Sequence, residues 1–202
     1  VKISALACNG STAFFRPMRI TGGKARGIPL TTGRAKHVRP ATDKMREAVF
    51  SSLGQVIEGA KFLDLFAGSG SYGLEAASRG AIGGVFVEKH PHAGTAIQQN
   101  IAAVLKSLGN PQELELALIR RDVLRFESAE SFNLVFMDPP YDLARTHGRQ
   151  LLDQVKALMT PDGVLVYELP GDLEIPATGW ECRRRIGKSG RNEPSTAILT
   201  PK

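Results

Sequence analysis

Short apolar runs alternate with longer amphipathic segments along most of this 202-residue chain. The run 133–137 has no polar alternation, which is typical of a strand buried on both faces. The segment 92–108 instead carries apolar residues at helical spacing and ends at a Gly-Asn-Pro sequence. Repeated strand–helix units of this kind predict an α/β fold with a doubly wound, mostly parallel sheet. The predicted strands are 62–66, 84–88, 113–119, 133–137 and 164–168, and the predicted helices are 42–53, 70–79, 92–108 and 144–159.

The two ends of the chain depart from this alternation. Residues 18–30 predict a short hairpin around a Gly-Gly turn, and 180–186 can pair with 196–200 as a closing antiparallel unit. The first residues have an apolar stretch too short for a secretion signal, so we interpret them as a flexible leader. The predicted organisation is a leader over 1–17, a basic N-terminal β-hairpin extension over 18–42 and one main domain over 43–202.

Charge is concentrated near the beginning of the chain. The formal net charge is +6, yet residues 1–42 hold eight Lys or Arg and no acidic residue, so the remainder is slightly acidic. Because Lys and Arg near phosphates release condensed counterions, this distribution favours a polyanion partner. A solvated basic tail is the alternative interpretation. The predicted RNA-binding residues are Arg19, Lys24, Arg26, Arg34 and Lys36.

Several classes of protein are disfavoured by the sequence. No apolar run reaches membrane-spanning length, so no membrane partner is expected. Cys8 and Cys182 give neither a disulfide framework nor metal-ligand spacing, which favours a reducing cytoplasm. The four histidines show no spacing for metal binding or catalysis, and nothing in the sequence requires more than a monomer.

The sequence Asp138-Pro139-Pro140-Tyr141 follows the apolar run 133–137 directly. The two prolines end the strand, because proline cannot donate to a sheet ladder and fixes its own φ. A carboxylate, rigid carbonyls and an aromatic ring are therefore expected at the carboxyl end of a central strand, where α/β sheets bind ligands. This set is suited to a planar ring that bears an amine. An ordinary strand end with a solvated aspartate accounts for these four residues alone equally well.

A glycine-rich turn follows the predicted strand 62–66. Gly68, Gly70 and Gly73 match the G-x-G-x-x-G pattern, in which backbone approaches a ligand at a helix N-terminus. Glu88 ends the next strand at the spacing expected for a carboxylate that binds ribose hydroxyls. Asp64, just before the turn, disfavours a pyrophosphate and suits the cationic amino group of S-adenosylmethionine.

Asp122 follows the third predicted strand and is placed to accept a hydrogen bond from an adenine amine. The alternative is a loop carboxylate that pairs with Arg120 or Arg121.

These motifs together resemble those of class I S-adenosylmethionine-dependent methyltransferases. Within that class, Asp-Pro-Pro-Tyr is similar to the signature of amino-methyltransferases that act on nucleobases. Two further stretches, 18–27 and 39–47, are similar to the bacterial family that methylates the exocyclic amine of one guanine in 16S ribosomal RNA. The resemblance covers about 18–168, while the first 17 residues and 187–194 depart from it.

The resemblance implies a Rossmann-like seven-stranded sheet with a small N-terminal β extension. It also implies S-adenosylmethionine as cofactor, and 16S rRNA or the small ribosomal subunit, including an assembly intermediate, as partner. Residues 39–46 are expected beside the methionine end of the cofactor. The candidate cofactor-binding residues are Asp64, Phe66, Gly68, Gly70, Glu88, Lys89, Asp122, Val123, Arg39 and Thr42, and the catalytic candidates are Asp138, Pro139, Pro140 and Tyr141.

The predicted reaction is methyl transfer to guanine N2. Tyr141 is expected to stack on an extruded guanine, while Asp138 and the Pro139 carbonyl accept hydrogen bonds from its amine. An adenine-N6 methyltransferase acting on RNA or DNA is the nearest alternative, because the choice of guanine rests on the resemblance alone. A nucleotide-binding oxidoreductase is a further alternative, but the sequence shows no residues suited to hydride transfer. A non-catalytic RNA-binding module does not explain the series of acidic residues.

Overall fold

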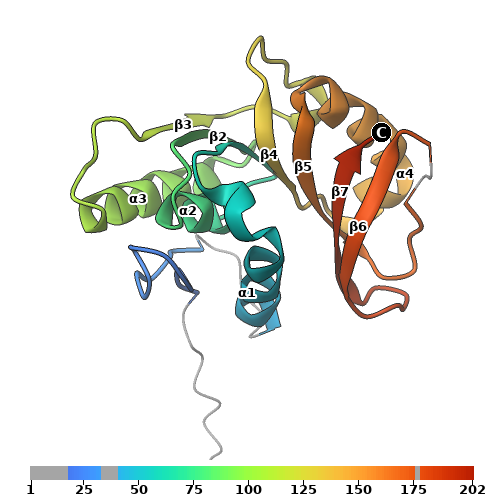
Figure 1. The fold of residues 1–202 in the computed structure, drawn as a ribbon, viewed down its shortest axis with the longest axis horizontal. Coiled ribbons are helices and arrows are strands. Elements are labelled where there is room, and N and C mark those ends of the chain that lie inside the picture. Colours follow the sequence, from blue (N-terminus) through green and yellow to red (C-terminus); the bar gives the residue numbers. More distant parts are fainter. Residues whose placement is uncertain (1–17, 33–40, 176–177) are drawn as a thin grey trace, which may run out of the picture.

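The computed structural model describes residues 18–32, 41–175 and 178–202, with side chains in the second range from residue 43 onward (Figure 1). The predicted leader 1–17 lies outside these residues, as do Arg34, Lys36 and Arg39.

One seven-stranded sheet organises the described chain, with the strand order β3-β2-β1-β4-β5-β7-β6. β1 to β5 run parallel, whereas β7 lies antiparallel between β5 and β6. The predicted doubly wound, mostly parallel fold is therefore confirmed. The strands are β1 (Lys61–Leu65), β2 (Gly83–Val87), β3 (Glu115–Ile119), β4 (Phe132–Met137), β5 (Met159–Pro170), β6 (Trp180–Gly187) and β7 (Pro194–Pro201).

Helices cover both faces of this sheet (Figure 1). They are α1 (Ala41–Leu53), α2 (Ser71–Ser78), α3 (Pro91–Ser107) and α4 (Tyr141–Ala157), with short 3₁₀ turns η1 (Gly54–Ile57) and η2 (Val123–Arg125). Residues of α1, α2 and α3 share one apolar cluster, and residues of α4 belong to a second cluster. β4 feeds both clusters, because successive side chains of a strand point to opposite faces: Phe136 belongs to the first and Val135 to the second.

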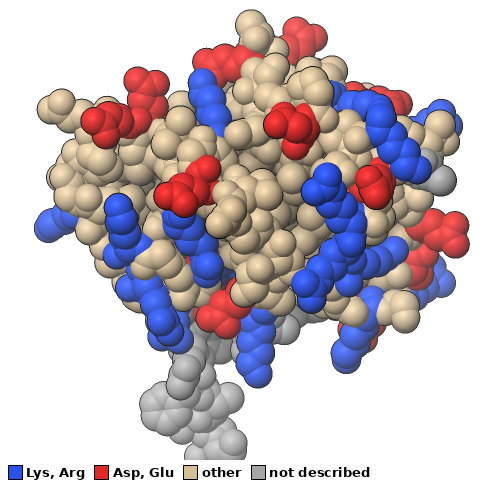
Figure 2. Space-filling view, in the orientation of Figure 1, with Lys and Arg blue, Asp and Glu red and all other residues tan. Residues whose placement is uncertain are grey.

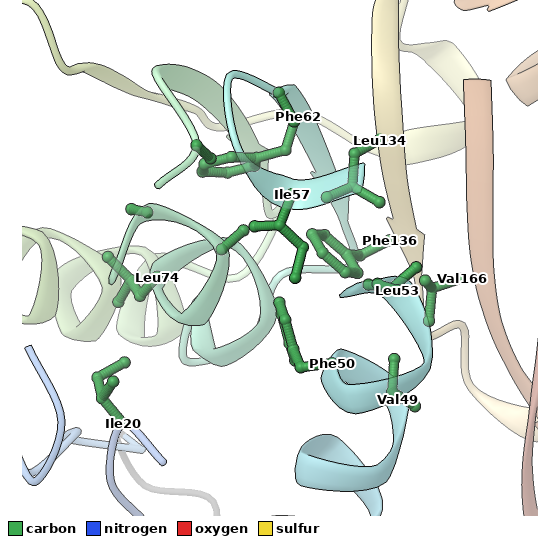
Figure 3. Packing of buried hydrophobic residues seen from close by; sticks show 14 of the residues in the cluster. Ile20, Val49, Phe50, Leu53, Ile57, Phe62, Leu74, Leu134, Phe136 and Val166 are labelled. Carbon is green, nitrogen blue, oxygen red and sulfur yellow. The ribbon is translucent and has the colours of Figure 1, made fainter. Parts of the chain in front are cut away.

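Aromatic rings fill the first cluster at the point where α1 and α2 meet the sheet (Figure 3). Phe50 of α1 lies 5.7 Å from Phe136 between ring centroids, and Phe62 lies 5.3 Å from Phe86 in an edge-to-face arrangement. Such pairs add to the burial energy of each ring. The strands that carry the candidate site residues therefore pack against a dense aromatic core on one face of the sheet.

The segment 18–32 folds back on itself and packs against α2. The Ile20 amide donates to the Ile28 carbonyl at 2.9 Å, and the Leu30 amide donates to the Met18 carbonyl at 2.8 Å. The arms meet in a single antiparallel bridge, and the turn extends to Gly27 rather than closing at the predicted Gly-Gly pair. Ile20, Ala25 and Leu30 are buried in the first apolar cluster, so this segment shares the core of the sheet domain.

Candidate cofactor and substrate site

Two adjoining pockets open at the carboxyl ends of β1, β2, β4 and β5. The larger, which we call the apolar pocket, has a volume of about 360 Å³. The smaller, which we call the charged pocket, has a volume of about 150 Å³. Phe66 and Asp138 line both, so the two pockets meet at these residues. The apolar pocket also contains Val87, Glu88, Val123, Pro139 and Tyr141, and the charged pocket contains Met45, Arg46, Asp64, Tyr72 and Glu168.

The turn after β1 lines the charged pocket and leads the chain into α2. Phe66 has a φ of 60°, a left-handed conformation that is rare for a bulky residue, while Gly68 and Gly70 adopt similar angles at low steric cost. Gly70 is the N-cap of α2. Gly73 packs so closely on Phe62 and Phe86 that a β-carbon there would overlap both rings. Glycine is thus required for the turn at Gly68 and Gly70, and for helix–strand packing at Gly73.

Glu88, predicted to bind ribose, fastens this turn to the end of β2. One carboxylate oxygen accepts from the Gly68 amide at 2.9 Å, and the other accepts from the His90 amide at 2.8 Å. The residue is only 6% exposed, yet it lines the apolar pocket. Each oxygen retains a second lone pair that can accept from a ligand hydroxyl.

Asp64 lies at the bottom of the charged pocket and is 4% exposed. Its Oδ2 accepts from the Gly73 amide at 2.9 Å. Burial raises the pKa of this carboxyl to about 8, the Gly73 amide works in the opposite direction, and the negative Glu88 adds to the rise. A cationic group placed beside this carboxylate would favour its ionised form at neutral pH.

Asp138 stands at the end of β4, where its side chain is open to both pockets. Asp138 is exposed as a residue, but the surrounding strand ends desolvate its carboxyl, and this desolvation raises its pKa well above the usual value. The negative charges of Glu168 and Asp64 raise the pKa further. Three carboxyl groups therefore face one small space, and a cation there would stabilise all of them.

The prolines and Tyr141 close one side of the apolar pocket. Pro139 is buried, Pro140 is the N-cap of α4, and Tyr141 is the first residue of that helix rather than part of a loop. Because proline lacks an N–H, it is well tolerated immediately before a helix begins. The structure therefore holds Asp138 and Tyr141 at one wall of the same pocket.

Tyr72 and Glu168 belong to the charged pocket but are absent from the predicted site. The Tyr72 hydroxyl donates to Glu168 Oε2 at 3.1 Å, and the Tyr72 ring stacks on Phe136 with 5.2 Å between centroids. Burial raises the pKa of Glu168, while the Tyr72 hydroxyl and the positive Arg46 oppose this rise. The position of Glu168 near the carboxyl end of a parallel strand is the sequence signal that could have found it.

Arg46 belongs to the segment 39–46 that is expected beside the cofactor, although it is not among the individually named candidates. It is only 2% exposed, lines the charged pocket, and pairs with Asp43 at 3.0 Å and with Glu75 at 3.4 Å. It also donates to the backbone carbonyl of Arg19. Glu75 is fully buried and accepts in addition from Arg79 at 2.8 Å and from the amide and hydroxyl of Thr21. This network joins α1, α2 and the segment 18–32 behind the pocket.

Asp122 caps a short helical turn and pairs with a neighbouring lysine in the structure. Its Oδ1 accepts from the Leu124 amide at 3.1 Å and caps η2, while Oδ2 pairs with Lys89 at 3.2 Å. The Leu124 amide is the main cause of a lowered Asp122 pKa, and Lys89 adds to it. The pairing partner is thus Lys89 rather than Arg120 or Arg121. Binding of adenine by Asp122 stays a prediction, and Val123 and Lys89 line the apolar pocket.

The remaining candidates divide between exposed residues and undescribed ones. Arg19, Lys24 and Arg26 are all exposed on the segment 18–32. Arg34, Lys36 and Arg39 lie outside the described residues, and Thr42 falls in α1 but its side chain is not described. Within the described ranges, no helix has the length and apolar character needed to cross a bilayer.

Comparison with known proteins places this chain in a family. The family model described as Conserved hypothetical protein 95 matches residues 18–193. Ribosomal RNA small subunit methyltransferase D of Escherichia coli (strain K12) is 34% identical over 177 residues, which cover 83% of each chain. The chain belongs to this methyltransferase family. The predicted resemblance is thereby confirmed, and residues 18–32 lie within the matched range.

Further relatives agree along nearly the whole chain. YlbH of Bacillus subtilis (strain 168) is 32% identical over 166 residues, covering 80% of this chain and 87% of the relative. The solved structure of yhhF from Escherichia coli superimposes with a TM-score of 0.73 at 28% identity, covering 92% of this chain and 98% of that one. The family relationship thus holds at the level of both sequence and fold.

Proposed function

We propose that this protein transfers a methyl group from S-adenosylmethionine to the exocyclic N2 amine of a guanine in 16S rRNA of the small subunit. The observation that carries the proposal is the meeting of the charged and apolar pockets at Asp138. A cofactor that spans both pockets would present its reactive centre beside the carboxylate that begins the Asp-Pro-Pro-Tyr sequence. The name of the Escherichia coli relative supports ribosomal RNA of the small subunit as the substrate class.

The charges of the pockets fit this cofactor. S-adenosylmethionine carries an ammonium, a sulfonium and a carboxylate. The charged pocket offers Asp64 and Glu168 for the cations and the Arg46 guanidinium for the carboxylate. In the apolar pocket, Glu88 would accept from the ribose hydroxyls, and Val123 would pack on the adenine ring. A pyrophosphate would instead face several carboxylates, which argues against a dinucleotide oxidoreductase.

Asp138 orients the target amine in this proposal. Guanine N2 is a weak nucleophile, because its lone pair is delocalised into the ring. Hydrogen bonds to Asp138 and to the Pro139 carbonyl would turn that lone pair toward the reacting centre, and Tyr141 would stack on the ring. The cofactor, when bound, supplies an electrophilic methyl group on a positively charged sulfur. Asp138 also stabilises positive charge that develops on the amine, and it can accept the proton that the amine then releases.

Nucleoside analysis tests the proposal. Purified protein is incubated with labelled S-adenosylmethionine and either unmodified 16S rRNA or small subunits from cells that lack the gene. We expect labelled N2-methylguanosine at one site, and mass mapping of rRNA from cells with and without the gene should locate the same nucleotide. Label found in N6-methyladenosine instead would show that adenine, not guanine, is the target base. Absence of label in both substrates would reject RNA methylation.

A further inference from the structure

The edge strand β6 carries three consecutive arginines that the proposed reaction does not use. Arg183, Arg184 and Arg185 are exposed, and the loop to β7 adds the exposed Lys188 and Arg191. Basic side chains gather over this side of the molecule (Figure 2). Charges on an edge strand commonly serve only to prevent pairing with another sheet. A role in binding a partner requires in addition that these cations lie near the pockets and have side chains that are not already bonded to the protein.

The sheet register places the loop 188–193 at the same edge as the two pockets. β5 runs parallel to β4, and its last residue, Pro170, pairs with Pro194 at the start of β7. Ser195 then pairs with Gly187 at the end of β6, so the loop between these strands extends from the ligand-binding edge. β6 is three strands from β4, or about 14 Å at roughly 4.8 Å per strand. A few nucleotides of RNA can span this distance.

Two of the arginines serve to hold the edge together. Arg185 donates to Ser195 Oγ at 3.0 Å and to the carbonyls of Pro170, Gly171 and Leu173 at 3.0–3.1 Å. Arg183 donates to Thr200 Oγ1 at 3.2 Å. Both side chains are therefore committed to the fold.

The other three cations are available to a partner. A bulge between Cys182 and Arg184 sets Arg184 opposite Ile198, on the sheet face covered by α1. The side chains of Arg184, Lys188 and Arg191 make no hydrogen bond or ion pair within the part of the chain that the structure describes, although Arg191 lowers the pKa of Asp172 from a distance.

A second basic segment, residues 18–32, lies on the other side of the pockets from the β6–β7 hairpin. The segment 18–32 and the β6–β7 hairpin lie on opposite sides of α1, which contributes Met45 and Arg46 to the charged pocket (Figure 1). Met18 lines the same pocket from the first side, and Met45 lies next to Gly187 on the second. Because the pockets themselves are rich in carboxyl groups, they repel phosphates, and cations on both sides would compensate for this repulsion.

We propose that Arg184, Lys188 and Arg191 form an RNA-backbone-binding surface that holds the substrate on the side of the pockets opposite to residues 18–32. This inference rests on the proposed function, because it assumes that the target nucleotide enters between the two basic segments. It predicts that RNA on both sides of the target nucleotide contacts the protein.

Matched charge variants test the inference. The triple variant Arg184→Gln/Lys188→Gln/Arg191→Gln is compared with Lys61→Gln/Lys106→Gln/Arg149→Gln, which removes the same charge away from the ligand-binding edge. Binding of unmodified 16S rRNA is measured by filter binding between 50 and 200 mM salt, and KM for methyl transfer is measured in parallel. We expect the first triple to weaken RNA binding roughly tenfold near 0.1 M salt. The slope of log affinity against log salt concentration should decrease by about two to three, because fewer counterions are released from the RNA. The affinity of this variant for S-adenosylmethionine should stay unchanged.

Several outcomes would overturn the inference. Equal RNA affinity in both triples would show that the surface formed by Arg184, Lys188 and Arg191 does not contact RNA. A defect on assembled subunits without any on naked RNA would show that the surface docks a protein instead. If the triple variant has a lowered melting temperature, the loop variant Lys188→Gln/Arg191→Gln alone should still weaken binding. Failure of the wild-type protein to transfer methyl groups would reject the proposed function, while the binding comparison would still decide this inference.

Discussion

The two pockets of the ligand-binding edge meet at Phe66 and Asp138 but are built differently. The charged pocket contains groups that are nearly buried and already bonded to the protein, such as Asp64 on the Gly73 amide and Arg46 on Glu75. The apolar pocket is larger and relies on shape, with Val87, Val123 and Pro139 in its walls. Charged groups need fixed partners to remain in a buried site, whereas apolar walls need only the correct shape. Substitutions in the first pocket should therefore alter charge and stability, and those in the second should alter packing of the ligand.

Removal of the carboxylate shared by both pockets should have the largest effect. We expect Asp138→Ala to reduce the rate of methyl transfer by about 10²- to 10³-fold, because the amine loses the acceptor that orients it and stabilises its charge. Affinity for S-adenosylmethionine, measured by calorimetry, should change little. Full activity in this variant would remove Asp138 from the mechanism.

The network behind the charged pocket should control stability. Glu75→Gln leaves the buried Arg46 without a charged partner on α2, and we expect a loss of roughly 3 kcal/mol in the free energy of unfolding. Denaturation in urea measures this loss, and the exposed Glu127→Gln serves as the control. Equal stability of the two variants would show that the network contributes nothing to folding.

Cofactor affinity should depend on pH through Asp64. In the ligand-free protein this carboxyl is protonated below its pKa of about 8, and a bound ammonium favours the ionised form. Binding then releases a proton, so affinity should rise between pH 6 and 7.5, by at most about tenfold per pH unit. Calorimetry in buffers of different ionisation enthalpy measures the release. In Asp64→Asn both the slope and the proton release should become smaller, and wild-type values in this variant would assign them to another group.

The smallest effect on methyl transfer is expected from substitution of Tyr141 in the wall of the apolar pocket. Tyr141→Ala removes a stacking surface, so KM for RNA should rise roughly tenfold, while Tyr141→Phe should behave like the wild type. Steady-state kinetics with saturating cofactor separate the two variants. If Tyr141→Phe has the same defect as Tyr141→Ala, the hydroxyl rather than the ring contributes to binding.

Local features of the chain made most of the fold and part of the site predictable. The glycine turn and Asp138 lie at the ends of apolar runs, and one short stretch of sequence determines each of them. The strands and helices follow from periodicity in the same way, so a doubly wound, mostly parallel sheet is as expected for repeated strand–helix units.

Contacts between distant residues were not predictable in this way. Glu75 bonds to Thr21, 54 positions away, and to Arg46, 29 positions away, so no window of sequence reveals the network. Tyr72 occupies a variable position of the glycine motif, and only the folded sheet brings it to Glu168, 96 positions away. The role of Arg185 likewise depends on carbonyl groups of another strand end.

The buried carboxylate of Glu75 also bears on the modularity of the protein. A domain boundary at residue 43 would separate Thr21 from Glu75 and withdraw Ile20 and Ala25 from the core. Residues 18–32 are therefore a fixed part of the sheet domain, and they could not be exchanged between relatives as an independent unit. Substitutions in this segment must therefore remain compatible with the surface of α2 on which it packs.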